Sequence, residues 1–246
     1  LILTLLSFHS FIIVSAHAQG TAHAHEAEEI STNVFQDQVR IGILAYRPKA
    51  DMKVRWQPLE NYLEQKIPNQ QFKIIPYNYA ELEDAVTNRS IDFVFTNSSH
   101  FVQIAYQTKL SSPLVTLINK RMGQPLSQFA GTILVRSDNQ TIKTLADLKH
   151  KTIAVPSQKS FGGFQMQAFE LYKIGIHLPD DANIIETTMP HDKAVYAILE
   201  GSADAAFIRS GVLEQMAQQA KIHPSDLRVI NPQNQFNFPF LNSTQL

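Results

Sequence analysis

The stretch Ser90-Ile91-Asp92-Phe93-Val94-Phe95-Thr96-Asn97-Ser98 recurs 112 positions later as Ser202-Ala203-Asp204-Ala205-Ala206-Phe207-Ile208-Arg209-Ser210. Two serines, an aspartate and a phenylalanine match at this offset (Ser90/Ser202, Asp92/Asp204, Phe95/Phe207, Ser98/Ser210). The same offset places Ile41-Gly42-Ile43 over Ile153-Ala154-Val155. A repeat of this length exceeds the roughly 20–50-residue period of solenoids. It predicts two copies of one α/β lobe, and a cleft between two such lobes is a common place for a small ligand.

The composition fits two folded lobes. The chain has 246 residues, 44% of them hydrophobic and 17% charged, which is ordinary for a globular protein of one or two domains. Its formal net charge of −1 gives no basic footprint for nucleic acid. It contains no cysteine, so disulfides and cysteine-ligated metal sites are excluded.

The N-terminal segment is expected to lie outside the fold. Residues 1–14 are almost all apolar and Ala16-x-Ala18 is a small-x-small site, which predicts a signal peptide over residues 1–18. The alternative is an uncleaved anchor, but the apolar run is shorter than the ~20 residues of a membrane span. Either reading exports the rest of the chain. Residues 19–38 are polar and predict a flexible linker rather than a His-rich metal-binding segment.

The rest of the chain alternates strand and helix patterns. In the first lobe, strands are expected at residues 39–44, 72–76 and 91–95, with helices at residues 55–66, 79–88 and 99–106. In the second, strands are expected at residues 151–155, 183–186 and 204–208, with helices at residues 163–174, 191–199 and 211–220. This order is typical of a parallel sheet with helices on both faces.

The links between the lobes are also predicted. Two further strands, at residues 114–118 and 131–135, flank a first crossing, and residues 227–230 would carry the chain back. The first lobe then comprises residues 39–125 and 229–246, and the second comprises residues 126–228. The predicted fold class is α/β, with two similar lobes, each a mostly parallel sheet flanked by helices, hinged by two crossing segments.

Candidate ligand-binding residues follow the predicted strands, because ligands of parallel sheets collect beyond the carboxyl ends of the strands and at helix N-termini. They are hydroxyls, amides, aromatic rings, two histidines, one arginine and a glycine pair: Tyr46, Asn97, Ser98, Ser99, His100, Thr132, Ser160, Phe161, Gly162, Gly163, His191, Arg209 and Ser210. This set suits a small polar ligand, most naturally an anion held by many hydrogen bonds.

Each candidate also has a structural alternative. The serines can be helix N-caps, the glycine pair can form a tight turn, and the histidines can be packing residues. Asp92 and Asp204 precede their strands' apolar cores, so they are expected to be turn or capping residues rather than ligands.

Catalytic patterns are weak. The sequence has no G-x-S-x-G elbow, no phosphate-binding G-x-x-x-x-G-K-[ST] loop and no H-E-x-x-H motif. No catalytic residue, metal site or cofactor is therefore expected, and an enzyme on this fold is the least favoured reading.

From about Val39 to Leu246 the sequence resembles the phosphate/phosphonate-binding periplasmic proteins, which have the type 2 periplasmic-binding-protein fold. The segments that carry the resemblance are the strand ending at Tyr46, Asp92 to His100, Gly131-Thr132, Leu145 to Lys149, Ser160 to Gly163, His191-Asp192 and Gly201 to Ala206. The resemblance implies a small oxyanion ligand held by Ser/Thr hydroxyls and helix N-termini.

Two segments, Ile208 to Glu214 and Phe238 to Thr244, are similar to the input domains of tetrathionate-sensor-like histidine kinases. This implies an extracytoplasmic sensory domain with a membrane signalling partner. The alternative is the solute-binding component of an ABC importer, with a permease as its partner. Lobe closure would then hinge near residues 119–131 and 226–231.

Overall fold

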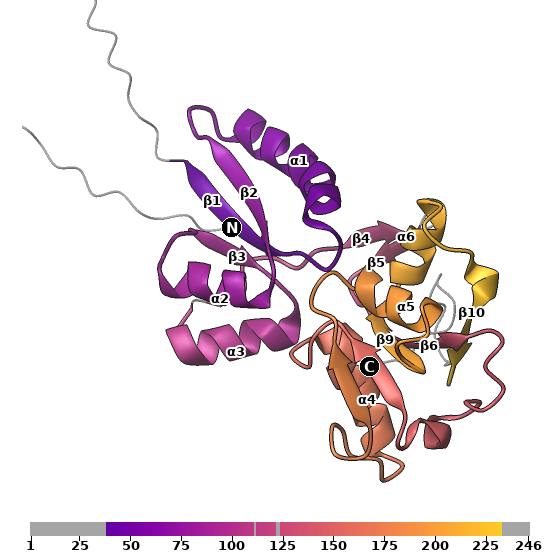
Figure 1. Cartoon of the computed structure of the whole chain (residues 1–246). Helices are drawn as coiled ribbons and strands as arrows, with labels where there is room; N and C mark the ends of the chain where they lie inside the picture. The colour runs from indigo at the N-terminus through magenta and orange to yellow at the C-terminus, as the bar shows by residue number, and fades with distance from the viewer. Residues whose placement is uncertain (1–37, 111, 122–123, 233–246) are drawn as a thin grey trace, which may run out of the picture. The chain divides into compact units, whose positions relative to one another are not determined.

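The computed structural model describes residues 38–110, 112–121 and 124–232 (Figure 1), which belong to one compact unit, Gln36–Leu246. The predicted signal peptide, nearly all of the predicted linker and residues 233–246 lie outside the described residues. No helix in the described part of the chain is long and apolar enough to cross a membrane.

The first lobe is built on a three-stranded parallel sheet. Its strands are β1 (Val39–Leu44), β2 (Phe72–Tyr77) and β3 (Phe93–Phe95), in the order β2-β1-β3. Its helices are α1 (Lys49–Lys66), α2 (Tyr79–Thr87) and α3 (Ser98–Thr108). Figure 1 shows α1 on one face of the sheet and α2 and α3 on the other.

Side-chain alternation along β1 explains this layering, because successive residues of a strand face opposite sides. Ile43 packs with Met52 of α1, whereas its neighbour Leu44 packs with Leu82 of α2. Local sequence sets the start of α2, where Asn78 and Glu81 form a reciprocal capping box.

The second lobe has a five-stranded mixed sheet in the order β10-β6-β9-β7-β8. The strands are β6 (Gly131–Arg136), β7 (Thr152–Val155), β8 (Asn183–Glu186), β9 (Ala205–Arg209) and β10 (Leu227–Ile230). β7 is parallel to β8 and β9, whereas β6 is antiparallel to β9 and to β10. The expectation of a mostly parallel sheet therefore holds for β7, β8 and β9 and not for the two strands that flank the crossings.

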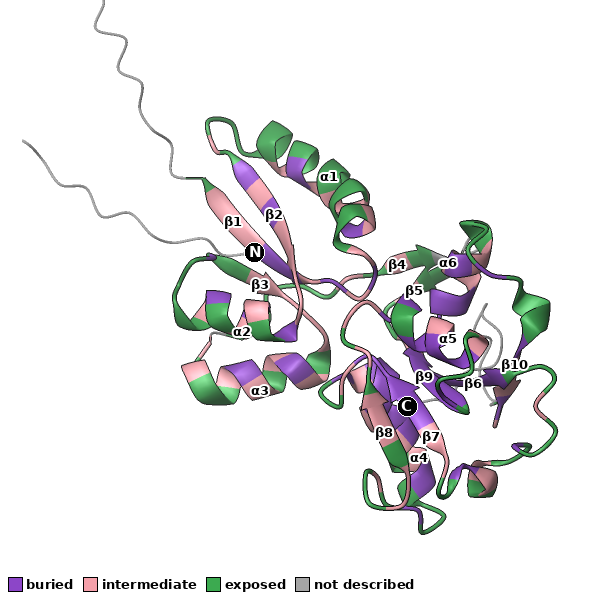
Figure 2. Ribbon diagram, viewed as in Figure 1, coloured by how far each residue is buried: buried purple, intermediate pink, exposed green. Residues whose placement is uncertain are grey.

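Helices cover both faces of this sheet. The π-turn η2 (Phe161–Gln165) runs into α4 (Met166–Tyr172), and α5 (Asp192–Leu199) and α6 (Val212–Gln218) follow; the short 3₁₀ helices η1 (Leu145–Leu148) and η3 (Pro224–Asp226) lie in loops. Phe207 belongs to the core cluster that includes Leu171 of α4, and Ile208 to the cluster that includes Ala194 of α5. Figure 2 shows β7 and β9 buried along most of their length, which makes this sheet the larger core.

The internal repeat is visible in backbone contacts. Asp92 donates its N–H to the Arg40 carbonyl (2.8 Å) and accepts the Arg40 N–H on Oδ2 (2.7 Å). Asp204 makes the same pair of contacts with Thr152, at 2.8 Å and 2.8 Å. Arg40 and Thr152 are themselves 112 positions apart. Both aspartates are thus strand-start residues, as expected, and they lie in separate sheets.

The crossing segments differ from expectation. Residues 114–118 form no regular strand, and Leu114, Val115 and Ile118 are exposed. A hairpin of β4 (Asn119–Arg121) and β5 (Gln124–Leu126) follows.

The return of the chain differs as well. Val229 and Ile230 were expected in the first lobe, but they pair with Leu134 and Ile133 of β6. They belong to the second sheet because the apolar side chains of β10 are buried there.

Candidate functional site

Arg209 stands where the two lobes meet. It ends β9, and its guanidinium carbon lies 4.7 Å from the ring centre of Tyr46 and 4.4 Å from that of Phe129. Tyr46 follows β1 in the first lobe, and Phe129 precedes β6 in the second. A guanidinium between two aromatic faces is held by cation–π attraction on both sides, so Arg209 is a positioned cation in contact with both lobes.

His191 supports this cluster from behind. Its ring is buried, and its Nδ1 accepts the backbone N–H of Arg209 (3.1 Å). The backbone N–H of His191 donates to the Tyr46 carbonyl (3.2 Å). Burial, helped by the charges of Arg209 and Arg47, lowers the pKa of His191 to about 3. The ring is therefore neutral at neutral pH, which leaves its proton on Nε2.

The predicted glycine-rich turn is tightly packed. The Ser160 hydroxyl oxygen accepts the N–H of Gly163 (3.1 Å) as the N-cap of η2. A Cβ on Gly162 would lie 2.9 Å from the Phe129 ring, and a Cβ on Gly163 would lie 2.6 Å from Cε1 of His191. Both glycines are thus required by neighbouring side chains, and the Phe129 ring in turn packs edge-on against Phe161.

Gln167 fixes this turn to the sheet, a role that the sequence did not indicate. It is fully buried, and its Nε2 donates to the carbonyls of Gly162 (2.9 Å) and Ile208 (3.0 Å). Its Oε1 has no partner in the described part of the chain. A glutamine on an otherwise apolar helix face was the signal that sequence reasoning missed.

The first lobe contributes the start of α3. Asn97 caps this helix by accepting the His100 N–H (3.0 Å), and its Nδ2 donates to the Tyr79 hydroxyl (3.1 Å). Ser98 is exposed on the first turn, and Ser99 donates to Oε1 of Gln165 in the other lobe (2.6 Å).

His100 is a packing residue. It is buried, with its Nδ1 2.8 Å from Thr96 Oγ1 and its Nε2 3.3 Å from a Glu83 carboxylate oxygen. Burial lowers its pKa, and the Glu83 carboxylate opposes that shift. Its ring also packs edge-on against Tyr79, with centres 4.7 Å apart.

Tyr79 connects the two halves of the predicted site. Its hydroxyl contacts the Ser160 side chain and the Phe161 backbone as well as Asn97, and burial raises its pKa. Beside it, Lys159 pairs with both carboxylate oxygens of Glu83 at 2.9 Å. The Asn97 and Ser160 regions are therefore adjacent.

Two predicted residues occupy structural positions where β6 begins and β9 ends. Thr132 is buried within β6. The Ser210 hydroxyl oxygen accepts the Ala130 N–H (2.9 Å), and the Ser210 N–H donates to the Ala130 carbonyl (2.8 Å). Ser210 thus extends the pairing of β9 with β6 by one residue.

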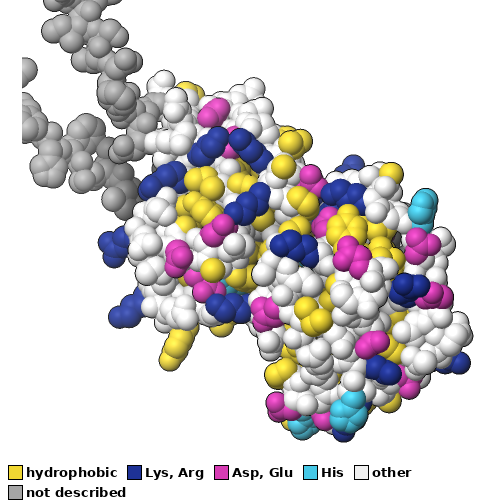
Figure 3. All heavy atoms as spheres, in the orientation of Figure 1, with side chains coloured by type: hydrophobic (Ala, Val, Ile, Leu, Met, Phe, Trp, Pro, Cys, Tyr) yellow, Lys and Arg dark blue, Asp and Glu magenta, His cyan; other side chains and the backbone are white. Residues whose placement is uncertain are grey.

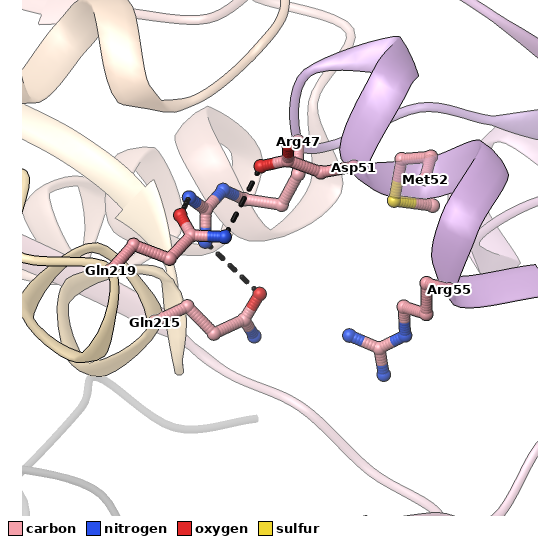
Figure 4. Close-up of a pocket in the computed structure, with 6 residues that line it drawn as sticks. All are labelled: Arg47, Asp51, Met52, Arg55, Gln215 and Gln219. Carbon is pink, nitrogen blue, oxygen red and sulfur yellow. Dashed lines mark hydrogen bonds between the residues drawn. The ribbon is translucent and has the colours of Figure 1, made fainter.

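A buried charged network lies beside the Arg209 cluster, and the sequence analysis did not single it out. Arg47, directly after Tyr46, is 3% exposed and forms two hydrogen bonds with Asp192 (2.7 and 3.0 Å). It also donates to Gln215 (3.1 Å) and to Gln219 of the second lobe. Figure 4 shows Arg47 and the two glutamines beside a cavity of about 130 Å³, which is lined by Arg47, Asp51, Met52, Arg55, Gln215 and Gln219. The position of Arg47 at the end of the first strand was the available sequence signal.

Other site types have little support in the described residues. No group of three or more His, Asp or Glu side chains there is arranged to hold a metal ion. Figure 3 shows acidic and basic side chains interspersed over the face it presents, in line with the net charge of −1.

Comparisons with known proteins agree with this architecture. The tetrathionate sensor histidine kinase TtrS of Salmonella typhimurium is 32% identical over 186 residues, which are 76% of this chain and 31% of that protein. The chain thus spans about a third of the length of this curated relative.

Solved structures share the fold. A binding protein component of an ABC phosphonate transporter from Pseudomonas aeruginosa aligns with a TM-score of 0.64 at 14% identity, over 85% of this chain and 67% of that one. PhnD1 from Prochlorococcus marinus, in complex with methylphosphonate, aligns with a TM-score of 0.64 at 17% identity, over 78% and 71%.

The family described as "ABC transporter, phosphonate, periplasmic substrate-binding protein" matches residues 41–246, most of the sequence. The two α/β lobes predicted from the internal repeat are confirmed, and so is the type 2 periplasmic-binding-protein fold that the family resemblance implied. The chain belongs to the phosphonate-type family of periplasmic substrate-binding proteins.

Proposed function

We propose that this chain binds a small anionic solute between its two lobes and acts as the extracytoplasmic input domain of a histidine kinase-like membrane sensor. The observation that carries the solute part is the Arg209 guanidinium, stacked between Tyr46 of one lobe and Phe129 of the other. A cation held at the junction of two lobes is suited to an anion that both lobes enclose.

The other proposed ligand groups surround this cation. Hydrogen bonds would come from Ser98, Asn97, Ser99 and the backbone N–H of Gly162, because the N–H groups of Ser160 and Gly163 already have acceptors and that of Phe161 contacts the Tyr79 hydroxyl. Tyr46 and Phe161 would wall the cleft, while Thr132, His100, His191 and Ser210 hold its frame. Peptide N–H groups at a turn that opens a helix are natural donors to an anion.

The signal would come from lobe closure. Side-chain contacts already cross between the lobes at Ser99–Gln165 and Glu83–Lys159. A solute shifts the equilibrium between open and closed lobes only by the difference between its affinities for the closed and open states. We place the lobes at residues 39–125 and 126–228, with Val229 and Ile230 on the second sheet, and the first hinge near residues 119–131.

The sensor role is supported by the 32% identity to a tetrathionate sensor kinase. The second candidate is the solute-binding component of an ABC importer, which the family match and the phosphonate-transporter structure favour. Reading the gene beyond the codon for Leu246 separates them: a membrane span leading to a kinase supports the sensor, and neighbouring permease genes support transport. These relatives bind solutes, so we expect no turnover by this chain.

The binding test is calorimetric titration of the full chain with tetrathionate, methylphosphonate, phosphate and small carboxylates. Arg209→Ala should lower the affinity for the tightest-binding of these anions roughly ten- to a hundredfold, because a hydrogen bond to a charged group contributes about 1.5–3 kcal/mol. Arg136→Ala is the matched control, since Arg136 ends β6 in the same sheet and is exposed. Equal affinities of wild type and Arg209→Ala would remove Arg209 from the site, and no binding of any anion would refute the solute class.

A further inference from the structure

The cavity between α1 and α6 lies beside the Arg209 cluster, and Arg55 on its wall donates to the Tyr46 hydroxyl (2.8 Å). None of the residues that the sequence singled out for the ligand lines it. One wall is α1, with Asp51, Met52 and Arg55, and the facing wall is α6 and the residue after it, with Gln215 and Gln219 (Figure 4). The cavity is therefore lined by a set of residues different from the predicted ligand-binding set.

The orientation of the Gln215 amide is determined by its neighbour. Nη1 of Arg47 can only donate, so the atom 3.1 Å away must be the amide oxygen of Gln215. The Gln215 nitrogen then points away from Arg47. This nitrogen is buried and has no hydrogen-bond partner among the described residues. A buried donor without an acceptor is costly, so a side-chain movement that turns this nitrogen toward an acceptor in the cavity is favourable.

Arg55 adds a positive charge on the opposite wall. Its guanidinium donates to the Tyr46 hydroxyl (2.8 Å) and to Oδ1 of Asn119 (3.0 Å), both of which are neutral. Within the described ranges, no carboxylate forms an ion pair with it. Figure 4 shows the Arg55 guanidinium and the Gln215 amide directed toward one another.

The remaining charges of the cavity are matched. Arg47 is paired with Asp192 at 2.7 Å, and Asp51 lies 3.5 Å from Lys221. The Asp51 carboxylate also accepts from Gln219 (3.2 Å). The cavity thus presents an excess of one positive charge and two amide protons.

We propose that this cavity is a second anion site, which binds a small oxyanion or carboxylate between the Gln215 amide and the Arg55 guanidinium. Its volume of about 130 Å³ leaves room for an ion the size of sulfate or acetate, because a cavity needs only about 10–15 Å³ to hold one water molecule. Arg55 belongs to the first lobe and Gln215 to the second. The bound ion bridges them, so it favours the arrangement in which α1 faces α6. This proposal does not depend on the solute bound at Arg209.

The test titrates sodium sulfate and sodium acetate, separately and at constant ionic strength, into the full chain carrying Arg209→Gln. This background removes the cation of the first site. Gln215→Glu keeps the size of the side chain and its acceptor for Arg47, but places a carboxylate where the amide donor was. Gln218→Glu makes the same charge change on an exposed residue of the same helix. Arg55→Gln is the second variant, in case Gln215→Glu disturbs folding.

We expect at least one of the two anions to bind the Arg209→Gln protein. Adding Gln215→Glu or Arg55→Gln should weaken that binding at least about tenfold, because each removes a donor aimed at the ion. Adding Gln218→Glu should leave the anion affinity within about twofold of that of the Arg209→Gln protein, because solvent and salt screen an exposed charge. The proposal is overturned if neither anion binds the Arg209→Gln protein, or if Gln215→Glu and Gln218→Glu have equal affinities. If Arg209→Ala did not lower the solute affinity in the calorimetric experiment above, the proposed role of Arg209 would fail. The expected effects of Gln215→Glu and Arg55→Gln on sulfate or acetate binding would stay the same.

Discussion

Acidification should destabilise this fold through His191. The ring is 2% exposed, and its Nδ1 accepts the Arg209 N–H. Burial first, and then the charges of Arg209 and Arg47, lower its pKa to about 3. The same side chain has a pKa of about 6.5 in an unfolded chain. Below pH 6.5 the unfolded state therefore takes up a proton that the folded state does not, and stability falls as the pH falls toward 3.

The magnitude follows from this window. Each pH unit below about 6.5 costs about 1.36 kcal/mol for one such proton. From pH 7 to pH 5, His191 should therefore reduce the free energy of unfolding by about 2 kcal/mol, or roughly thirtyfold in the folding equilibrium. Because the ring is almost fully buried, solvent screening does not reduce this figure appreciably.

The assay is urea unfolding of wild type and His191→Asn at pH 7 and pH 5. The asparagine oxygen can take the place of Nδ1 as acceptor for the Arg209 N–H, but it does not titrate. Wild type should lose about 2 kcal/mol more than the variant over this interval. His150→Asn, at an exposed histidine whose φ of 62° asparagine tolerates, should keep the wild-type dependence. Equal pH dependence in wild type and His191→Asn would refute the reasoning.

Two further experiments test packing beside the site. Arg47→Ala leaves Asp192 buried without its main partner and should lower the free energy of unfolding by about 3–5 kcal/mol, as measured in urea. Arg47→Met combined with Asp192→Leu should recover most of this loss. Equal destabilisation of the single and double variants would contradict the prediction. Gly163→Ala would place a Cβ 2.6 Å from both the His191 ring and Pro156, so it should cost about 1–3 kcal/mol and lower Tm, and an unchanged Tm would show that the turn adjusts freely.

The sequence predicted the fold well because the repeat is a repeat of backbone contacts. Ser90 donates its N–H and its hydroxyl to the Ala85 carbonyl, and Ser202 makes both contacts with Ala197. These pairs are again 112 positions apart. A polar residue that satisfies a strand or helix end is constrained by local geometry, so it recurs wherever that geometry recurs. Periodicity and spacing are sufficient to find such residues.

Contacts between the lobes could not be predicted in this way. Arg47 and Asp192 are 145 positions apart, and Arg47 and Gln215 are 168 apart. Their pairing depends on how two separately folded sheets pack, and no local pattern encodes that. The placement of β10 failed for a related reason, because an apolar run such as residues 227–230 fits the edge of either sheet.

The candidate site was predicted in part, and the reason lies in what polar residues do at strand ends. Ligand-binding residues and structural caps are the same residue types at the same positions, since both serve unpaired backbone groups at helix N-termini. In the structure, the hydroxyl oxygens of Ser160 and Ser210 each already accept a backbone N–H. The Gln215 amide nitrogen, in contrast, is buried with no acceptor in the described part of the chain. Whether a polar atom is already satisfied is a property of the fold, and it separates a cap from a donor that awaits a ligand. The Gln215 amide is therefore the reason to test the α1–α6 cavity for an anion in addition to the cleft that the sequence indicated.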